Sequence, residues 1–237
     1  MAPGIEVRGL SLRFGLRPIF DNLTFSIPGG QWSSLLGASG AGKTSLLRII
    51  AGLAKASGGE VRASDGLAIA GRLAWMGQKD LLYPWLNVRE NVALGARLRG
   101  EKADNARVNE LLELVGLASC ADERPAALSG GMRQRAALAR TLYEDRPIVL
   151  MDEPFSALDT LTRTRIQTLA ARLLTGRTVV LITHDPMEAS HRLLVLSPTG
   201  RIDDSHHLSG IPPRAPDNPA LLASQAQLLQ QLMRANG

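Results

Sequence analysis

The sequence predicts an α/β fold, and three features of the chain carry this prediction. A stretch at 32–36 that is typical of a short buried strand leads through a glycine-rich loop into residues 46–53, where apolar side chains recur at helical spacing. Two mostly apolar stretches, 148–151 and 178–182, are also typical of buried strands. Residues 5–14, in contrast, alternate apolar and polar side chains, as a strand with one buried face does. Strands of both kinds, interleaved with helices, indicate a mixed α/β protein.

Length and composition fit an ordinary globular protein. The chain has 237 residues, of which 45% are hydrophobic and 21% charged, enough for a sizeable core in one large domain or two small ones. The net charge of +5 comes from basic residues dispersed along the predicted helices, which favours a solvated surface over a nucleic-acid-binding patch. A single cysteine, Cys120, excludes an intramolecular disulfide and fits a reducing compartment. With neither a signal-peptide pattern nor an apolar run of membrane-spanning length, we expect a soluble, cytosolic chain unless a partner holds it at a membrane.

The chain begins with two predicted antiparallel strands. The second, at 23–27, alternates like residues 5–14 and ends at the turn Pro28-Gly29-Gly30. Phe14 closes the first strand shortly before the glycine-rich loop. Its ring fits two interpretations equally well: a face on which a nucleobase stacks, or an ordinary core aromatic.

The glycine-rich loop has the spacing of a phosphate-binding loop. Gly37, Gly42, Lys43 and Thr44 match the pattern G-x-x-x-x-G-K-[ST]. Glycines permit the tight turn that points successive N–H groups at phosphate oxygens, the lysine adds charge near the β- and γ-phosphates, and the threonine hydroxyl is a ligand for Mg²⁺. The phosphates would lie at a helix N-terminus, which favours anions. A turn that binds nothing is the alternative, but the strand before the loop and the helix after it argue against that. The residues expected to bind nucleotide here are Gly37, Ser39, Gly40, Gly42, Lys43, Thr44 and Ser45.

After the loop and its helix, the pattern becomes one of short strands. We expect strand-like pieces at 60–62, 67–69 and 73–76, followed by Gln78. The sequence Tyr83-Pro84-Trp85 then predicts an exposed aromatic turn, which is unfavourable without a partner surface. The alternative is that Trp85 packs inside the helical region that follows.

Residues 87–125 predict a helical subdomain inserted into the α/β pattern. Asn87 and Glu90 have the spacing of a capping box, which starts a helix running to about Leu98. A second helix is expected at 103–115 and ends at a glycine.

Two polar clusters follow the helical region. Ser129, Gly130 and Gly131 precede a helix, where serine and glycine are ordinary caps; the same residues predict a second anion nest without a lysine of its own. The pair Asp152 and Glu153 stands at the end of the buried strand 148–151. Adjacent acids there are unfavourable unless a metal ion or a reacting water needs them.

The C-terminal part predicts two more strands and a tail. Ser156-Ala157-Leu158-Asp159 precedes a helix to about Leu174, and the strand 178–182 closes on Thr183-His184-Asp185, where Asp185, Pro186 and Glu188 form a helix start. A final strand is expected at 193–196. The tail at 203–220 is proline-rich and loop-like, an amphipathic helix is expected at 221–233, and His206-His207 reads as solvated rather than as a metal site.

Taken together and in this order, these motifs resemble the ATP-binding subunit of an ABC transporter over residues 5–202. The resemblance implies one P-loop NTPase domain for 1–237, with an antiparallel β subdomain, a core at 1–86 and 126–202, the helical subdomain at about 87–125, and a tail and helix at 203–237. It also implies that the chain is an ATPase that uses ATP and Mg²⁺.

The resemblance assigns roles to particular side chains. Asp152 would hold Mg²⁺ together with Thr44 and Gln78, and Glu153 would polarise the attacking water. His184 would contact the γ-phosphate, and Gln78 would sense it while linking to a membrane partner. Ser129, Gly130 and Gly131 would close on the nucleotide bound by a second subunit, so the active form would be a head-to-tail homodimer with ATP sandwiched between subunits. Phe14 stands where the family most often has Tyr, which keeps the ring and loses the hydroxyl.

Within the family, the stretches Leu82–Val92 and Gly130–Arg135 and the tail at Ile211–Arg214 look like the importer branch that serves nitrate, sulfonates, taurine and thiamine-pyrimidine precursors. The resemblance then implies a transmembrane permease as partner, a periplasmic or extracellular solute-binding protein as indirect partner, no nucleic acid, and a peripheral location on the cytoplasmic face of the inner membrane. An ABC exporter ATPase, a non-transport ABC ATPase and a catalytically silent module are the alternatives. The intact Lys43, Asp152, Glu153 and His184 argue against the last.

Overall fold

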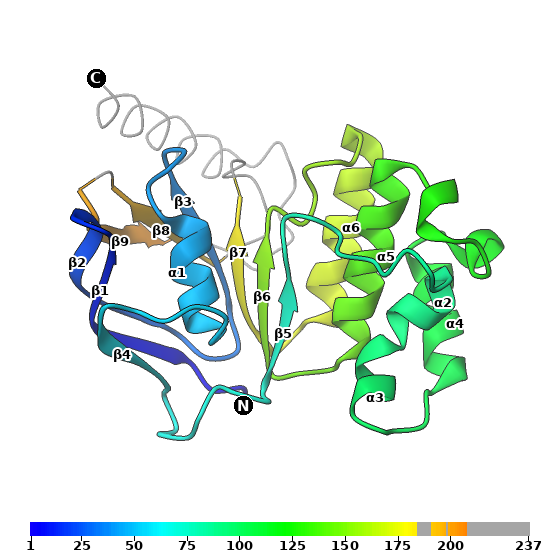
Figure 1. Cartoon of the computed structure of the whole chain (residues 1–237), viewed down its shortest axis with the longest axis horizontal. Coiled ribbons are helices and arrows are strands. Elements are labelled where there is room, and N and C mark those ends of the chain that lie inside the picture. The colour runs from blue at the N-terminus through cyan, green and yellow to red at the C-terminus, as the bar shows by residue number, and fades with distance from the viewer. Residues whose placement is uncertain (184–190, 198, 208–237) are drawn as a thin grey trace.

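The computed structural model describes residues 1–183, 191–197 and 199–207, with side chains described as far as residue 203. Within these residues the chain forms a six-stranded sheet of order β5-β6-β7-β3-β8-β9 and a three-stranded sheet of order β2-β1-β4 (Figure 1). The strands of the larger sheet are β3 (Trp32–Gly37), β5 (Leu73–Met76), β6 (Ile148–Asp152), β7 (Thr178–Ile182), β8 (Arg192–Leu196) and β9 (Ile202–His207). This is the α/β architecture that the sequence predicts.

Five strands of the larger sheet run parallel, and this direction sets the position of the site. β3 and β6 both pair in parallel with β7, so that Leu35 and Asp152 lie on either side of Ile182. The carboxyl ends of parallel strands meet at one edge of a sheet, and ligands of open α/β sheets bind there. The glycine-rich loop after β3 and the acidic pair at the end of β6 therefore emerge side by side.

β8 is not the last strand of the chain. The expected loop-like tail from 203 is wrong at its start, because β9 (Ile202–His207) pairs antiparallel with β8. A turn at 197–201, in which the N–H of Ser197 bonds the carbonyl of Arg201 (2.8 Å), reverses the chain between the two strands. The polar composition of Asp203 to His207 hid this strand, since a strand at a sheet edge needs few apolar side chains. The expected helix at 221–233 and the helix start at Asp185 lie outside the described residues.

The smaller sheet is antiparallel, as expected. Its strands are β1 (Ile5–Phe14), β2 (Arg17–Ile27) and β4 (Gly58–Ala63), with β1 in the centre. β2 begins six residues before the expected 23–27, because its first half continues the pairing with β1 through irregular register that sequence alternation does not reveal. The expected strand piece at 67–69 is instead part of a turn region that follows the bond from Gly66 N–H to Ala63 (2.9 Å).

The helices of the described residues lie between the strands of the larger sheet in the chain. They are α1 (Lys43–Ile50), α2 (Val88–Val92), α3 (Leu94–Leu98), α4 (Asn105–Leu114), α5 (Gly130–Tyr143) and α6 (Thr160–Leu173), with 3₁₀ turns at Ala118–Cys120 and Pro125–Ala127. The capping box at Asn87 and Glu90 is present. The single helix expected from 87 to 98 is wrong, because the chain leaves helical geometry at Ala93 (ψ 4°) and starts a new short helix.

Two hydrophobic cores lie on opposite faces of the larger sheet. On β6, Ile148 and Leu150 belong to the core shared with α1 and the antiparallel sheet, while Val149 and Met151 belong to the core shared with α5 and α6. Strand side chains point alternately to the two faces, so a strand covered on both sides is apolar throughout. This explains why β6 and β7 are buried along their whole length.

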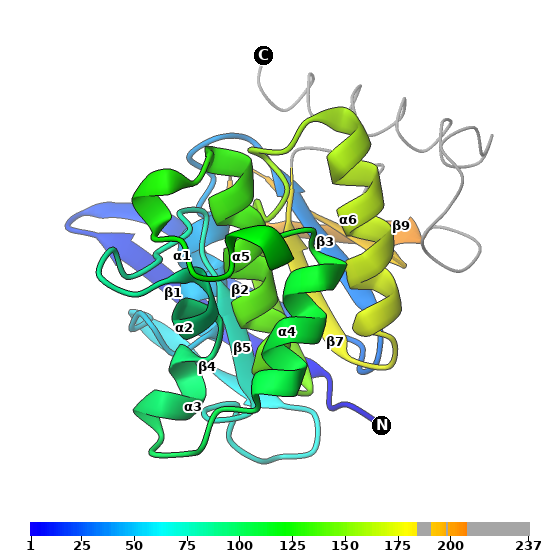
Figure 2. The same ribbon diagram turned by 90° about the vertical axis from the view of Figure 1, so that its right-hand side faces the viewer.

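The helical segment 88–127 shares its core with the α/β part. Val88, Val108 and Leu111 pack in the same cluster as the α5 and β6 side chains. Figure 2 shows α2, α3 and α4 gathered around α5 on one side of the molecule. In the described part of the chain, no helix combines the length and the apolar character needed to cross a membrane.

Candidate nucleotide site

The glycine-rich loop has the backbone of an anion-binding turn. Gly37, Gly40 and Gly42 all have positive φ (150°, 80° and 99°). At Gly37 a Cβ would lie 2.4 Å from the carbonyl oxygen of Leu196 on β8, so the neighbouring strand enforces the glycine. Gly42 is the N-cap residue of α1, in left-handed conformation and without a side-chain cap. The N–H groups of the first helical turn have no partner within a helix, so they point towards whatever lies at the loop.

Lys43 is buried and folded back onto this loop. Its Nζ donates to the carbonyls of Gly37 (2.8 Å) and Ala38 (2.9 Å). Burial lowers the pKa of the ammonium group, and the carboxylates of Glu153 and Asp152 act in the opposite direction. The ammonium group is therefore a cation held inside the loop, which a phosphate oxygen can approach from the loop's concave side.

Asp152 is a buried carboxylate at the carboxyl end of β6. Its side chain is 1% exposed, and neither oxygen has a hydrogen-bond partner within the described part of the chain. Burial is the main cause that raises the pKa of this carboxyl. The Thr44 hydroxyl lies near enough to lower that pKa without making a hydrogen bond of ordinary geometry. An unsatisfied buried carboxylate beside a hydroxyl is a donor set that fits Mg²⁺, a cation that takes oxygen ligands.

Glu153 occupies a strained turn directly after β6. Its φ is +50°, a conformation that non-glycine residues adopt mainly where the surrounding structure enforces it. Its N–H bonds the carbonyl of Ile182 (2.9 Å), and its carboxylate accepts a hydrogen bond from Gln78 Nε2 (3.2 Å). The Glu153 side chain lies beside the loop and lines the same hollow as Lys43.

A hollow of about 270 Å³ joins these groups. Phe14 stands at its rim with 62% of its surface exposed, so its interpretation as a core aromatic is wrong. The lining residues are Phe14, Ile19, Ser39, Gly40, Gly42, Lys43, Thr44, Ser45 and Glu153. The structure therefore brings the loop lysine, a carboxylate and an exposed aromatic ring to one hollow, and it decides between the two interpretations of Phe14 that the sequence left open.

The Ser129 loop, defined here as residues 129–131, has a different geometry from the expected anion nest. Ser129 is a regular N-cap of α5 whose Oγ accepts a hydrogen bond from the N–H of Met132 (3.2 Å). Neither Gly130 nor Gly131 has positive φ. The cap uses a donor that a nest would offer to an anion, and the Ser129 loop does not line the hollow.

Gln78 takes a different place from the predicted one. Gln78 is held against Glu153 and is not among the residues that line the hollow. His184 lies outside the described residues. Sequence reasoning missed Gln134, whose side chain donates to the carbonyl of Glu153 (3.0 Å). Its position on α5, four residues before the buried Leu138, was the available signal, because a glutamine on a buried helix face needs polar partners.

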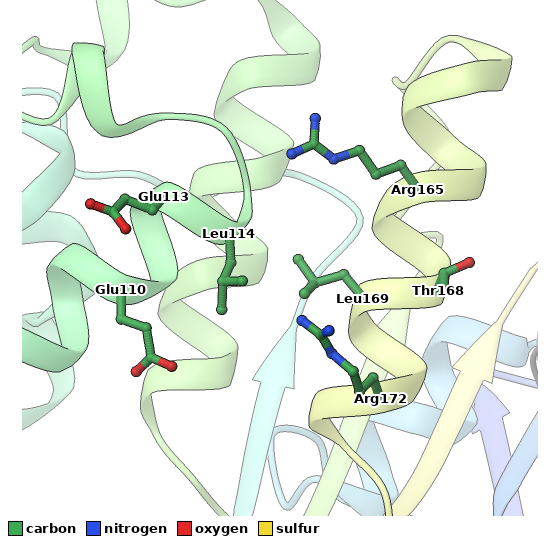
Figure 3. A pocket seen from close by; sticks show the side chains of 7 residues that line it. All are labelled: Glu110, Glu113, Leu114, Arg165, Thr168, Leu169 and Arg172. Atoms are coloured by element: carbon green, nitrogen blue, oxygen red, sulfur yellow. The ribbon is translucent and has the colours of Figure 1, made fainter.

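A second hollow, of about 420 Å³, lies between α4 and α6. Figure 3 shows Leu114 of α4 and Leu169 of α6 turned towards one another, with Arg165 and Arg172 reaching across from α6. Glu110, Glu113 and Thr168 complete its lining. We place the nucleotide site at the smaller hollow, because that one is lined by the left-handed glycines and by Lys43.

The chain is similar to known proteins over most of its own length. The sequence profile of the ABC transporter family matches residues 20–156. The aliphatic sulfonates import ATP-binding protein SsuB of Delftia acidovorans is 42% identical over 98% of this chain and 95% of its own. The taurine import ATP-binding protein TauB of Jannaschia sp. is 41% identical over 86% of this chain and 82% of its own.

The chain also resembles solved structures of ABC proteins. The dimeric post-hydrolysis state of the ATP-binding cassette MJ0796, bound to ADP and Pi, superimposes with a TM-score of 0.77 at 30% identity and covers 87% of this chain and 100% of that one. A bacterial Atm1-family exporter with ATP bound matches with a TM-score of 0.76 at 28% identity, over 86% of this chain and 38% of that one.

Proposed function

The chain belongs to the ABC transporter ATP-binding family and is an ATPase, and from this premise we propose that it drives import of a small sulfonate or taurine-like solute through a separate permease. One observation carries the catalytic part of the proposal. Parallel pairing of β3 and β6 with β7 places the phosphate-binding loop beside Asp152 and Glu153, and Glu153 lines the same hollow as Lys43. ATP hydrolysis requires groups that bind the phosphates and a carboxylate beside them, and both lie at this hollow.

ATP binding follows from the loop and the exposed ring. The N–H groups of the loop and of the first turn of α1 would bind the β- and γ-phosphates, and Lys43 would exchange a carbonyl of Gly37 or Ala38 for a phosphate oxygen. Phe14 would stack on the base, since its ring lies exposed at the rim of the hollow. Thr44 and Asp152 would hold Mg²⁺, which neutralises phosphate charge when bound.

Hydrolysis needs a positioned water, because phosphoryl transfer depends mostly on placement and charge stabilisation. The Glu153 carboxylate is the acid at the hollow, and we assign to it the orientation of the attacking water. In the described state that carboxylate accepts a hydrogen bond from Gln78, so Gln78 would have to release it or share it before water is activated. His184 remains, by resemblance, the candidate contact of the γ-phosphate.

A second copy of the chain would complete the site. The Ser129 loop does not line the hollow of its own chain, and we assign it to the nucleotide bound by the second copy. The dimeric form of the related MJ0796 cassette supports a homodimer. In that arrangement hydrolysis depends on closure, because half of each site belongs to the facing subunit.

The aromatic turn, defined here as Tyr83-Pro84-Trp85, is the surface we assign to the permease. Trp85 is 65% exposed and contacts the Tyr83 ring edge to face, with ring centroids 5.1 Å apart. The alternative in which Trp85 packs inside the helical region is wrong. Paired exposed aromatics are effective interface anchors, because they bury a large area with few rotatable bonds. A permease bound here would place the chain on the cytoplasmic face of the membrane, with a solute-binding protein on the far side.

The test separates catalysis from transport. We expect Glu153→Gln to bind ATP with native affinity and to lose about 10²- to 10⁴-fold in hydrolysis rate, the range for a positioned acid–base group. Near-native turnover in that variant contradicts the role of Glu153. For transport, the chain is reconstituted in vesicles with a candidate permease and supplied with taurine, an alkanesulfonate or nitrate. ATP-dependent uptake of nitrate alone would replace the sulfonate class and leave the ATPase assignment intact.

Trp85→Ala tests the docking surface. This exposed substitution should leave folding and the ATPase activity of the isolated subunit unchanged while vesicle uptake falls. Full uptake by the variant contradicts the assignment of the aromatic turn.

A further inference from the structure

A ring of contacts closes around Glu153 and passes through helix α5. Gln78 donates to the Glu153 carboxylate (3.2 Å), and Gln134 of α5 donates to the Glu153 carbonyl (3.0 Å). Arg133, next to Gln134, donates through Nε to the Asp80 carboxylate (3.1 Å), and Asp80 lies two residues from Gln78. One helix therefore holds both the backbone of Glu153 and the segment that carries the partner of its carboxylate.

Gln134 uses both ends of its amide to hold the turn after β6. Besides the Glu153 carbonyl, Nε2 reaches the Ser156 hydroxyl (3.3 Å), and Oε1 accepts the N–H of Ala157 (2.9 Å). The residue is 6% exposed, so water does not readily replace these bonds. Glu153 is in left-handed conformation, which persists only where neighbours enforce it. Gln134 is one such neighbour.

The segment at Asp80 is also held to α5 by hydrogen bonds. Arg140 donates to the carbonyls of Asp80 (2.6 Å) and Leu81 (2.8 Å), and Asp80 Oδ1 accepts the N–H of Leu82 (3.1 Å). Arg133 also donates to the carbonyl of Leu128 just before the Ser129 loop (2.7 Å). These bonds prevent the Gln78 segment from drifting away from Glu153 independently of α5.

We propose that Gln134 is a positioning residue for ATP hydrolysis, and that the Arg133–Asp80 pair secures the same arrangement from the opposite side of the ring. This inference rests on the role proposed for Glu153. Gln134 does not line the nucleotide hollow. It holds the backbone from which the Glu153 carboxylate projects, and a misplacement of about 1 Å in a catalytic group lowers rates by up to about 10²-fold.

The test replaces Gln134 by methionine, which keeps the length of the side chain and removes its donors and acceptor. We expect kcat per folded molecule to fall about tenfold or more, with KM for ATP within about twofold of native, because the phosphate loop is untouched. The matched control is Thr141→Val, which removes a buried hydrogen bond to the Ala137 carbonyl within the same helix. A purely structural role of Gln134 would lower stability in both variants and leave kcat per folded molecule unchanged, and that result overturns the proposal.

A second variant keeps the proposal testable if Gln134→Met does not fold. Asp80→Asn opens the ring at a side chain that is 32% exposed, and it should lower kcat by severalfold without changing KM. In the Arg133→Gln background, Asp80→Asn should lower kcat by less than it does alone, because the two side chains share one contact, although Arg133→Gln also removes the bond to the Leu128 carbonyl. A native kcat in Asp80→Asn contradicts the role proposed for the Arg133–Asp80 pair. If Glu153→Gln is inactive while Gln134→Met and Asp80→Asn both have native kcat, this inference fails and the function assigned to Glu153 stands. If Glu153→Gln hydrolyses ATP at the native rate, the function assigned to Glu153 fails instead.

Discussion

Helices α1 and α5 both begin at a segment of serine and glycine residues, but their N-termini are built differently. At α1, Gly42 is a left-handed N-cap without a side-chain cap, and the loop before it turns through glycines of positive φ. At α5, Ser129 caps the helix in the ordinary way, and the following glycines are helical. The first N-terminus is open to an anion, and the second is already satisfied by its own serine.

The comparison shows that glycine serves two separate purposes in this chain. At Gly42 the backbone conformation requires it, and a Cβ would also lie 2.5 Å from Ile19 Cγ2. At Gly131 the backbone is helical and a Cβ would lie 3.2 Å from the Ala157 carbonyl oxygen, so close packing, not backbone conformation, favours glycine there. The α1 loop presents its N–H groups and Lys43 to the hollow of its own chain, whereas the Ser129 loop does not line that hollow.

The largest expected effect is at the α1 loop. Lys43→Ala should weaken equilibrium ATP binding by about 10- to 100-fold, the value of one or two charge-assisted hydrogen bonds. Nucleotide titration of the isolated chain measures it. A native dissociation constant would mean that the open N-terminus binds phosphate without its lysine, which removes the main chemical difference between the two loops.

The glycines themselves provide the sharpest contrast. Gly42→Ala should destabilise the fold by about 1–3 kcal/mol, because alanine must adopt a strained backbone in a crowded position. Gly130→Ala should stabilise the isolated chain by about 0.5–1 kcal/mol, because its φ is not in the left-handed region and a Cβ would come no nearer than 3.9 Å to Arg133 Nη2. Urea unfolding of both variants decides this, and effects of the same sign would contradict the distinction.

The aromatic ring of Phe14, at the rim of the nucleotide hollow, should contribute more to ATP binding than to the stability of the fold. Phe14→Ala should weaken ATP binding by about 1–3 kcal/mol, the range for stacking on one base. The melting temperature should stay close to native, because the ring is mostly exposed. A lower melting temperature with native ATP affinity would show that Phe14 supports the strand instead of the nucleotide.

The smallest effect is expected at the cap of α5. Ser129→Ala should cost about 1 kcal/mol of unfolding free energy, the usual value of an N-cap side chain. ATP affinity of the isolated chain should not change, while hydrolysis at high protein concentration should fall because the dimer site loses a hydroxyl. Weaker ATP binding by the dilute monomer would place the Ser129 loop in its own chain's site.

The sequence alone determined the fold class, the phosphate loop and the acidic pair. These features are local: a run of apolar residues predicts a buried strand, and the G-x-x-x-x-G-K-T spacing demands particular backbone angles within a few residues. The capping box at Asn87 and Glu90 was predictable for the same reason. The family resemblance added roles to these residues, and the comparisons confirm the family.

Only the tertiary structure decided which groups meet. The exposure of Phe14 and Trp85, the bond from Gln78 to Glu153 and the hold of Gln134 on that turn all depend on segments far apart in the chain. The edge strand β9 and the break between α2 and α3 escaped sequence reasoning because pairing with β8 and packing against α5 override weak local preferences. Local chemistry specifies each element, but the position of a side chain is set by what the rest of the chain packs against it.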